Sequence, residues 1–197
     1  MYLYLDHSMA TETILSIFLG IGLAASVGFR VFLPLFALSL ASYFGVWDLN
    51  ENWQWIGSLV AVLTLGLATL LEIFAYFIPW FDNLLDSIAV PLAAIAGTAV
   101  MVSTVADLDP VITWSLAIIA GGGTATAIKG AGATGRLAST ATTGGLANPV
   151  YATIETGTAM VVTAASIFAP ILAAILVIII LVLIFRIYRS IRPRTKT

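Results

Sequence analysis

Apolar residues occur in long runs along this chain, and the runs are separated by prolines, charged residues or small polar residues. A helix needs about 20 apolar residues to cross the hydrocarbon core of a bilayer, which is about 30 Å thick. Seven runs approach that length, and they predict seven membrane-spanning helices in a single domain, residues 1–197. The predicted spans are residues 11–27, 31–44, 55–78, 88–105, 111–128, 150–169 and 171–188.

Two segments depart from a simple span. Residues 31–44 are short and contain Pro34, so we expect either a kinked span or a re-entrant segment, which would leave six spans and move the N-terminus inside. In residues 80–88, apolar side chains recur at positions i, i+3, i+4 and i+7, which predicts an amphipathic helix lying in the membrane interface. The predicted fold class is all-α: a polytopic transmembrane helical bundle with short, broken or re-entrant pieces and one interfacial helix.

Composition agrees with a membrane protein and excludes other classes. Hydrophobic residues make up 60% of the chain and charged residues only 9%, whereas soluble domains carry about 25% charged residues. The formal net charge of -2 excludes a nucleic-acid-binding protein, which needs a basic surface to neutralise phosphates. The chain has no cysteine, so it has neither a disulfide nor a thiolate nucleophile.

The distribution of basic residues predicts the orientation. Of the 8 Lys and Arg residues, five lie at the C-terminus, and cytoplasmic segments are enriched in these residues. We therefore expect residues 189–197 to form a basic cytoplasmic tail and, with seven spans, the N-terminus to lie outside. The first ten residues contain no Lys or Arg, so we do not expect them to be a cleavable signal peptide.

Small residues recur at every fourth position in three segments. Such stripes allow close helix contact in lipid, where no hydrophobic effect presses helices together. We expect them to pack within one chain; a homo-oligomer interface is the alternative. The stripes are Gly20/Ala24/Gly28, Ala89/Ala93/Gly97 and Ala117/Gly121/Ala125.

Ionisable residues in or beside the spans are the strongest functional signal, because each costs at least ~2.5 kcal/mol at the membrane centre unless paired or hydrated. With seven spans they all fall toward the cytoplasmic side and predict a polar vestibule there. The alternative is structural: the charges snorkel or form ion pairs, Arg30 with Glu72 and Arg136 with Glu155. The residues concerned are Arg30, Glu72, Lys129, Arg136 and Glu155.

Residues 121–148 hold eight of the 16 glycines. Three glycines in residues 130–135 spell GxGxxG, but a chain this apolar offers no βαβ unit, so we do not expect a nucleotide site. Backbone amides here, beside Lys129 and Arg136, would instead hold an anion or a lipid phosphate. A flexible or packed cytoplasmic connection is the alternative. Polar residues added to the candidate site on this ground are Ser139, Thr140, Thr143 and Asn148.

Catalytic and metal-binding patterns are scarce. The only histidine, His7, lies across the membrane from the charged residues in the predicted topology, so no Ser-His-acid arrangement or histidine metal site is assembled. Glu72, Asp82, Asp86 and Glu155 suit a divalent cation by ligand type, but their spacing is unspecific, and no metal site is predicted. We expect no cofactor and no enzymatic activity; an intramembrane enzyme is the remotest alternative.

Three segments carry a family resemblance. They are residues 28–35 (GFRVFLPL), 78–86 (IPWFDNLLD) and 136–149 (RLASTATTGGLANP). With these segments the chain resembles the bacterial family of small multi-span membrane proteins catalogued as domain of unknown function 4126. The resemblance covers nearly the whole chain and implies a multi-pass protein of the bacterial inner membrane. It implies no activity, substrate or site residue.

The charged residues favour one function over another. We expect a small permease or channel-like protein with a cytoplasm-facing polar site for an anionic or phosphate-bearing solute or a lipid head group. Its expected partners are membrane lipids and a small anionic solute. The alternative is a non-transporting scaffold protein whose charges form internal ion pairs.

Overall fold

The structure is a computed structural model that describes the backbone of residues 2–75, 79–106 and 108–191 and the side chains of residues 11–75, 88–106 and 108–190. All regular secondary structure in these residues is helical, as predicted. The helices are α1 (Tyr2–Phe29), α2 (Phe32–Tyr43), η1 (Glu51–Gly57), α3 (Leu59–Ala75), α4 (Pro79–Thr104), α5 (Pro110–Leu116), η2 (Ala117–Gly122), α6 (Gly123–Thr143), α7 (Asn148–Phe168) and α8 (Pro170–Ile191).

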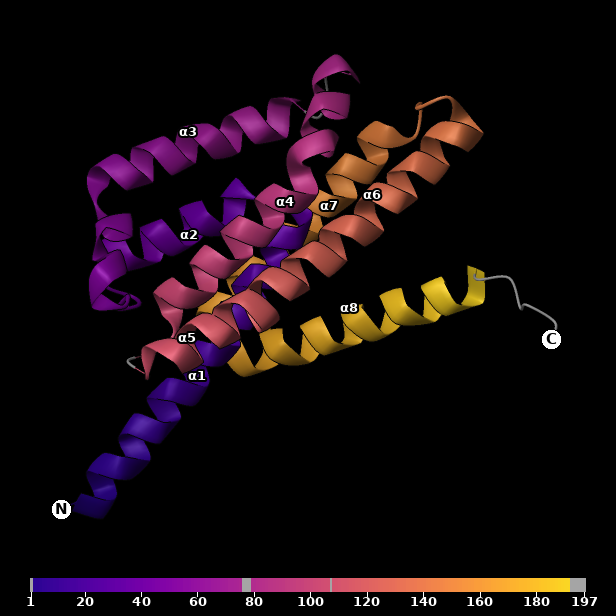
Figure 1. The fold of residues 1–197 in the computed structure, drawn as a ribbon. Helices are drawn as coiled ribbons and strands as arrows, with labels where there is room; N and C mark the ends of the chain where they lie inside the picture. Colours follow the sequence, from indigo (N-terminus) through magenta and orange to yellow (C-terminus); the bar gives the residue numbers. More distant parts are fainter. Residues whose placement is uncertain (1, 76–78, 107, 192–197) are drawn as a thin grey trace.

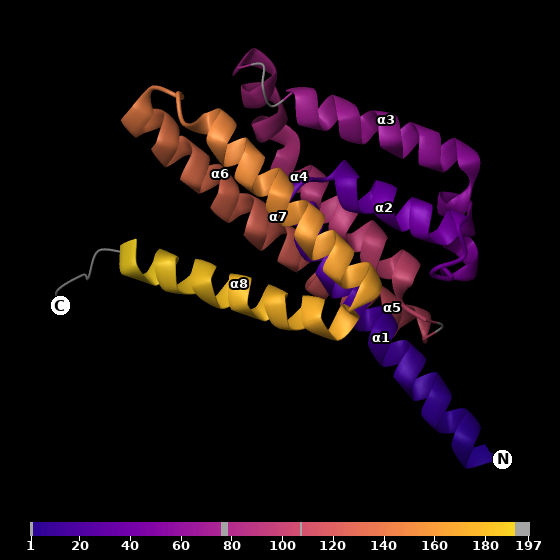
Figure 2. The same cartoon turned by 180° about the vertical axis from the view of Figure 1, so that it is seen from behind.

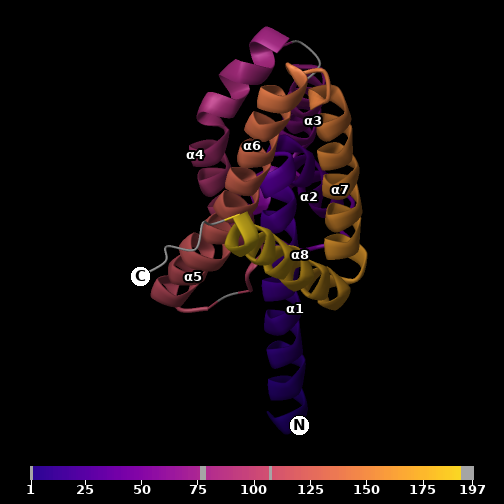
Figure 3. The ribbon, with the colours of Figure 1, turned by 90° about the vertical axis from the view of Figure 1, so that its right-hand side faces the viewer.

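Helix α1 is the central helix of the bundle. It contacts α2, α4, α6, α7 and α8, and its residues Leu23, Ala24 and Val27 have no exposed surface. Figure 3 shows α4 and α7 on opposite sides of α1. Helix α3 packs mainly against α2 and lies at the edge of the bundle (Figures 1 and 2). The core is therefore built around α1, and α3 is a peripheral helix.

Among the residues that the structure describes, four helical segments are long and apolar enough to cross a membrane. They are Thr11–Phe29, Pro110–Thr143, Asn148–Phe168 and Pro170–Ser190. The pair η1 and α3 would add a fifth, but the two helices meet at an angle of 64°. Helix α2 and residues Ile88–Thr104 are shorter apolar helices. The structure thus shows a helical bundle of membrane-spanning character, and the predicted number of seven spans is not confirmed.

Several predicted boundaries differ from the observed ones. The predicted span 55–78 is broken at Ser58 between η1 and α3. Residues 80–88 do not form a separate helix, because the backbone of α4 continues through them to Thr104. Helix α1 begins at Tyr2 rather than at residue 11.

The glycine-rich connection expected after residue 128 is also helical. Helices α5, η2 and α6 form one continuous segment of 34 residues, Pro110–Thr143. Asp109 caps its start, with a side chain that accepts a hydrogen bond from the backbone N–H of Val111, and Gly144, which has a φ of 64°, caps its end. Only a short turn therefore separates α6 from α7.

The small-residue stripes face one another inside the bundle, as expected. A methyl group on Gly97 of α4 would lie 2.6 Å from Cβ of Ala125 and 2.8 Å from the carbonyl oxygen of Gly121. A methyl group on Gly28 of α1 would lie 2.6 Å from Cβ of Ile128. These approaches bring the backbones of three helices close together, which is the role of small residues in lipid.

Replacing Gly97 with alanine should lower the melting temperature of the detergent-solubilised protein. The added methyl group meets backbone atoms that have nowhere to move, and overpacking of this kind costs about 1–3 kcal/mol. Gly157→Ala is the matched control, because Gly157 is a helical glycine with open space around the added atom. There alanine should raise stability by up to about 1 kcal/mol. Equal melting temperatures for the two variants would contradict this packing.

Candidate functional site

The break between α1 and α2 is the starting point of the polar interior. Helix α1 ends at Phe29 and α2 begins at Phe32, so Arg30 and Val31 connect two helices that run in opposite directions (Figure 1). Helix ends leave backbone carbonyls and amides without partners inside the helix. In an apolar bundle these groups need other partners, because an unsatisfied buried amide costs several kcal/mol in lipid (~2–7).

Glu72 supplies the partners for the start of α2. Its Oε1 accepts a hydrogen bond from the N–H of Val31 at 2.7 Å, and its Oε2 accepts one from the N–H of Phe32 at 2.9 Å. The side chain comes from α3 and is 6% exposed. A carboxylate at a helix N-terminus is also stabilised by the helix dipole. Glu72 therefore caps α2 and ties α3 to the break.

Lys129 supplies a partner for the end of α1. Its Nζ donates a hydrogen bond of 2.9 Å to the carbonyl oxygen of Phe29, and the residue is 1% exposed. A cation at a helix C-terminus complements the negative end of the dipole. The two ends of the break are thus met by groups of opposite charge, from α6 and from α3.

Arg30, in the break itself, reaches α7. Its Nε donates to Oγ1 of Thr156 at 2.9 Å, and its Nη2 donates to the carbonyl oxygen of Ala152 at 2.8 Å. An ion pair of Arg30 with Glu72 is one of the two pairs expected from the sequence. The hydrogen bonds described here instead direct Arg30 to α7 and Glu72 to backbone amides.

The second expected ion pair, Arg136 with Glu155, is present. Nη2 of Arg136 on α6 donates to Oε2 of Glu155 on α7, and the two residues are 3% and 4% exposed. The guanidinium carbon of Arg136 lies 6.0 Å from the centre of the Tyr151 ring, within the range of a cation–π contact. This pair joins the two helices on either side of the 144–147 turn.

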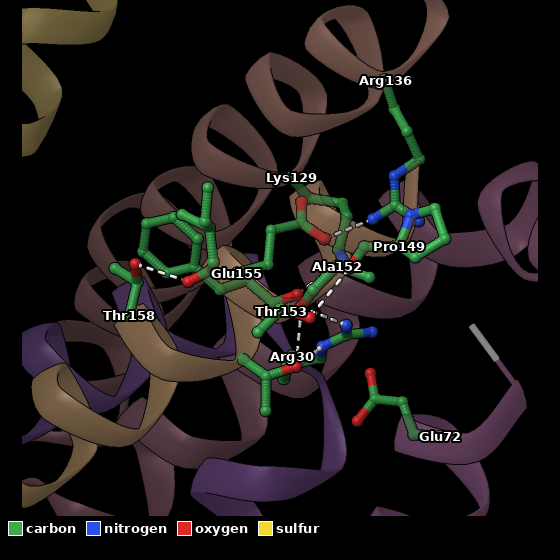
Figure 4. A network of polar contacts seen from close by, with 12 residues as sticks. Arg30, Glu72, Lys129, Arg136, Pro149, Ala152, Thr153, Glu155 and Thr158 are labelled. Atoms are coloured by element: carbon green, nitrogen blue, oxygen red, sulfur yellow. Dashed lines mark hydrogen bonds and ion pairs between the residues drawn. The ribbon is translucent and has the colours of Figure 1, made fainter. Parts of the chain in front are cut away.

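The five charged residues gather in one region, although they come from the break after α1 and from α3, α6 and α7. Figure 4 shows Lys129, Arg136 and Glu155 above Arg30, with Glu72 at the lower right. Lys129 lies within electrostatic reach of all four other charges. The cluster is buried and tied to backbone groups, so among the described residues it has the form of a packed polar network.

The remaining predicted site residues flank the turn between α6 and α7, with Ser139, Thr140 and Thr143 near the end of α6 and Asn148 at the start of α7. Asn148 donates to Oγ1 of Thr140 at 3.0 Å, and Thr143 donates to the carbonyl oxygen of Ser139 at 2.8 Å. Thr140 and Thr143 are exposed. These side chains stabilise the turn. They lie about ten or more residues beyond Lys129, the residue of α6 that contacts the break.

The GxGxxG pattern does not form a loop. Gly130, Gly132 and Gly135 all lie inside α6, whose amides are engaged in the helix. Two of them make room for polar side chains of α7: an added Cβ would lie 2.8 Å from Oε1 of Glu155 at Gly132, and 2.4 Å from the Tyr151 hydroxyl at Gly135. Helix packing explains these two glycines, and a phosphate loop is not formed.

A cavity of about 480 Å³ lies between α6, α7 and α8, beside the polar network. Of the predicted site residues only Glu155 lines it. The sequence gives no signal for its α8 wall, because that helix is almost uniformly apolar. The cavity is lined by Phe29, Ile128, Ala131, Gly132, Thr134, Gly135, Ala138, Tyr151, Ile154, Glu155, Thr158, Ile180, Leu183, Ile184, Ile187 and Tyr188.

The part of the chain that the structure describes contains no group of three or more His, Asp or Glu residues able to hold a metal ion. The side chains of Asp82 and Asp86, which the sequence considers as ligands, lie outside the described residues, as does that of His7.

Replacing Glu72 with alanine should lower the melting temperature in detergent strongly, because two buried amides at Val31 and Phe32 lose their acceptor. Each unsatisfied amide costs about 1–3 kcal/mol. Glu72→Gln keeps one acceptor oxygen and should lose less. Glu12→Ala, which removes an exposed acid on α1, is the control and should have little effect. A Glu72→Ala protein with the same melting temperature as the wild type would show that the cap is dispensable.

Comparison with known proteins gives a family and no close relative. The model of the family described as a domain of unknown function (DUF4126) matches residues 17–190. No curated protein and no solved structure matches the chain. The matched residues run from α1 to the end of α8 and include the break, the polar network and the cavity. The chain therefore belongs to the DUF4126 family.

Proposed function

We propose that this protein is a small permease-type membrane protein that binds an amphiphilic molecule in the cavity between α6, α7 and α8. The observation that carries the proposal is the cavity itself: its volume of about 480 Å³ lies within the range of about 300–1,000 Å³ typical of small-molecule sites. Such sites are mostly apolar with a few placed polar groups, and here these include Glu155, Tyr151 and Thr158.

The cavity is accessible from the outside of the bundle. Ile154, Leu183 and Ile187 line it and are nevertheless 63%, 51% and 60% exposed. Around apolar helices of membrane-spanning length, the surroundings are lipid. A ligand that enters between α7 and α8 would therefore come from the bilayer, which favours a molecule with an apolar part.

The contacts of the polar network favour an amphiphilic ligand over a small free anion. Arg30, Lys129 and Arg136 each donate to a backbone carbonyl or a carboxylate of a neighbouring helix. Of the ligands expected from the sequence, a lipid head group attached to an apolar chain matches the cavity best. The protein's partners are then membrane lipids, and its role is binding and passage rather than catalysis.

The orientation remains a proposal drawn from charge. The basic residues at the C-terminus favour a cytoplasmic end of α8 in a bacterial inner membrane. The cavity would then open into the cytoplasmic leaflet, because its α8 wall lies in the second half of that helix.

A scaffold role is the second candidate function. It is favoured by the structural use of the charges, which cap the helix break and join α6 to α7. In this case the cavity is filled by ordinary bilayer lipid, and the stability of the bundle is what the buried charges provide.

Replacing Ile184 with tryptophan should weaken binding of a fluorophore-labelled long-chain fatty acid about tenfold, equivalent to about 1.4 kcal/mol, because the indole fills the cavity. Ile178→Trp is the matched control: it lies on the same helix, is 62% exposed and does not line the cavity. The readout is fluorescence titration of the purified protein. Unchanged affinity in a folded Ile184→Trp protein would refute a ligand site in this cavity.

The scaffold role predicts coupling between Arg136 and Glu155. Arg136→Met and Glu155→Leu should each destabilise the protein by about 3–5 kcal/mol, because each leaves a buried charge, and the double variant should recover much of that loss. Thermal unfolding of all four proteins completes the cycle. A double variant whose loss equals the sum of the single losses would show that the pair does not act as a unit.

A further inference from the structure

We propose that the ligand is an anionic phospholipid, with one acyl chain in the cavity between α6, α7 and α8 and its phosphate at the basic end of α8. This inference rests on the proposed function and specifies its ligand. It combines the position of the cavity along the bundle with the charges that surround that end of the molecule.

The cavity lies at one end of the bundle. On α8 it is lined only by residues between Ile180 and Tyr188, in the second half of the helix. On α7 its lining residues, from Tyr151 to Thr158, belong to the half next to the 144–147 turn, and on α6 they run along the middle of the helix from Ile128 to Ala138. Figures 1 and 2 show α8 diverging from α6 and α7 toward this same end. A lipid seated here would have its head group beyond the end of α8 and its chain along the helix.

Two exposed arginines lie at the end of α8 beside the cavity. Arg186 and Arg189 are exposed and directly adjoin the cavity residues Ile187 and Tyr188 in the chain. They do not line the cavity, but arginine has a long stem that reaches from an apolar surface to the interface. On the other side, Thr140 in the last turn of α6 is exposed.

In a bilayer, the head group determines which lipid the site prefers. An acyl chain gains little by leaving the bilayer for an apolar cavity, because lipid tails are as apolar as the cavity wall. Selection among lipids must therefore come from polar contacts. Guanidinium groups bind phosphate oxygens with two parallel hydrogen bonds, and each basic residue near the surface favours an anionic lipid. The charges at this end thus select for a net negative head group.

Native mass spectrometry of the delipidated protein in detergent tests the inference. The protein is titrated with dioleoylphosphatidylglycerol or dioleoylphosphatidylcholine, which share their chains and differ in head-group charge. We expect one tightly retained lipid, bound about tenfold more strongly as the glycerol form. Arg186→Gln with Arg189→Gln should reduce that preference to about twofold, because the two arginines together contribute about fivefold. Glu51→Gln, an exposed acid on η1, is the charge-changing control and should leave it unchanged.

Cavity variants separate the two levels of the proposal. Ile184→Trp should lose the retained lipid of either kind, whereas Ile178→Trp should keep it; Leu183→Trp, on the same wall, replaces Ile184→Trp if that protein does not fold. If cavity filling abolishes binding but both lipids bind equally well in all arginine variants, the choice of an anionic phospholipid is wrong and the cavity site stands. If the retained lipid survives cavity filling, both the site and its ligand are wrong.

Discussion

The interrupted helix pair α1 and α2 is the constraint on which the interior of this protein depends. Reversing the chain at Arg30 and Val31 exposes a helix C-terminus and a helix N-terminus to each other inside an apolar bundle. The carbonyl of Phe29 accepts from Lys129 and the amides of Val31 and Phe32 donate to Glu72. Because the two ends carry opposite partial charges, they require opposite ions. The break therefore brings α6 and α3 to the same place.

Close packing around α1 follows from the same arrangement. Lys129 reaches Phe29 only if α6 lies near the end of α1, and Gly28 lets Ile128 approach at that level. About one turn further along α6, Gly132 leaves space for the side chain of Glu155 from α7. The polar network and the small-residue contacts are thus two parts of one interface. Helix α8 contacts α1, α6 and α7 but diverges from α6 and α7 toward its C-terminal end, and the cavity lies between the three helices α6, α7 and α8.

Some of this structure was predictable from the sequence and some was not. Proline and asparagine mark the starts of α7 and α8, and small residues at every fourth position mark α1, α4 and the continuous segment of η2 and α6, because both signals are local. The pairing of Arg136 with Glu155 was expected because two opposite charges in apolar segments need each other. The same reasoning from charge predicts an ion pair of Glu72 with Arg30. The partners of Glu72 are instead the amides of Val31 and Phe32, and such backbone partners leave no trace in a charge pattern.

The glycines of α6 show why a motif needs its structural context. In a loop, GxGxxG frees the backbone to approach a phosphate. In a helix the same letters place residues three apart on one face, where a missing side chain makes a notch. Gly132 and Gly135 form such a notch, and Glu155 and Tyr151 of α7 fill it. These two side chains also line the cavity. The notch therefore fixes the position of these two polar side chains at the cavity wall. Packing requires glycine at both positions of the notch.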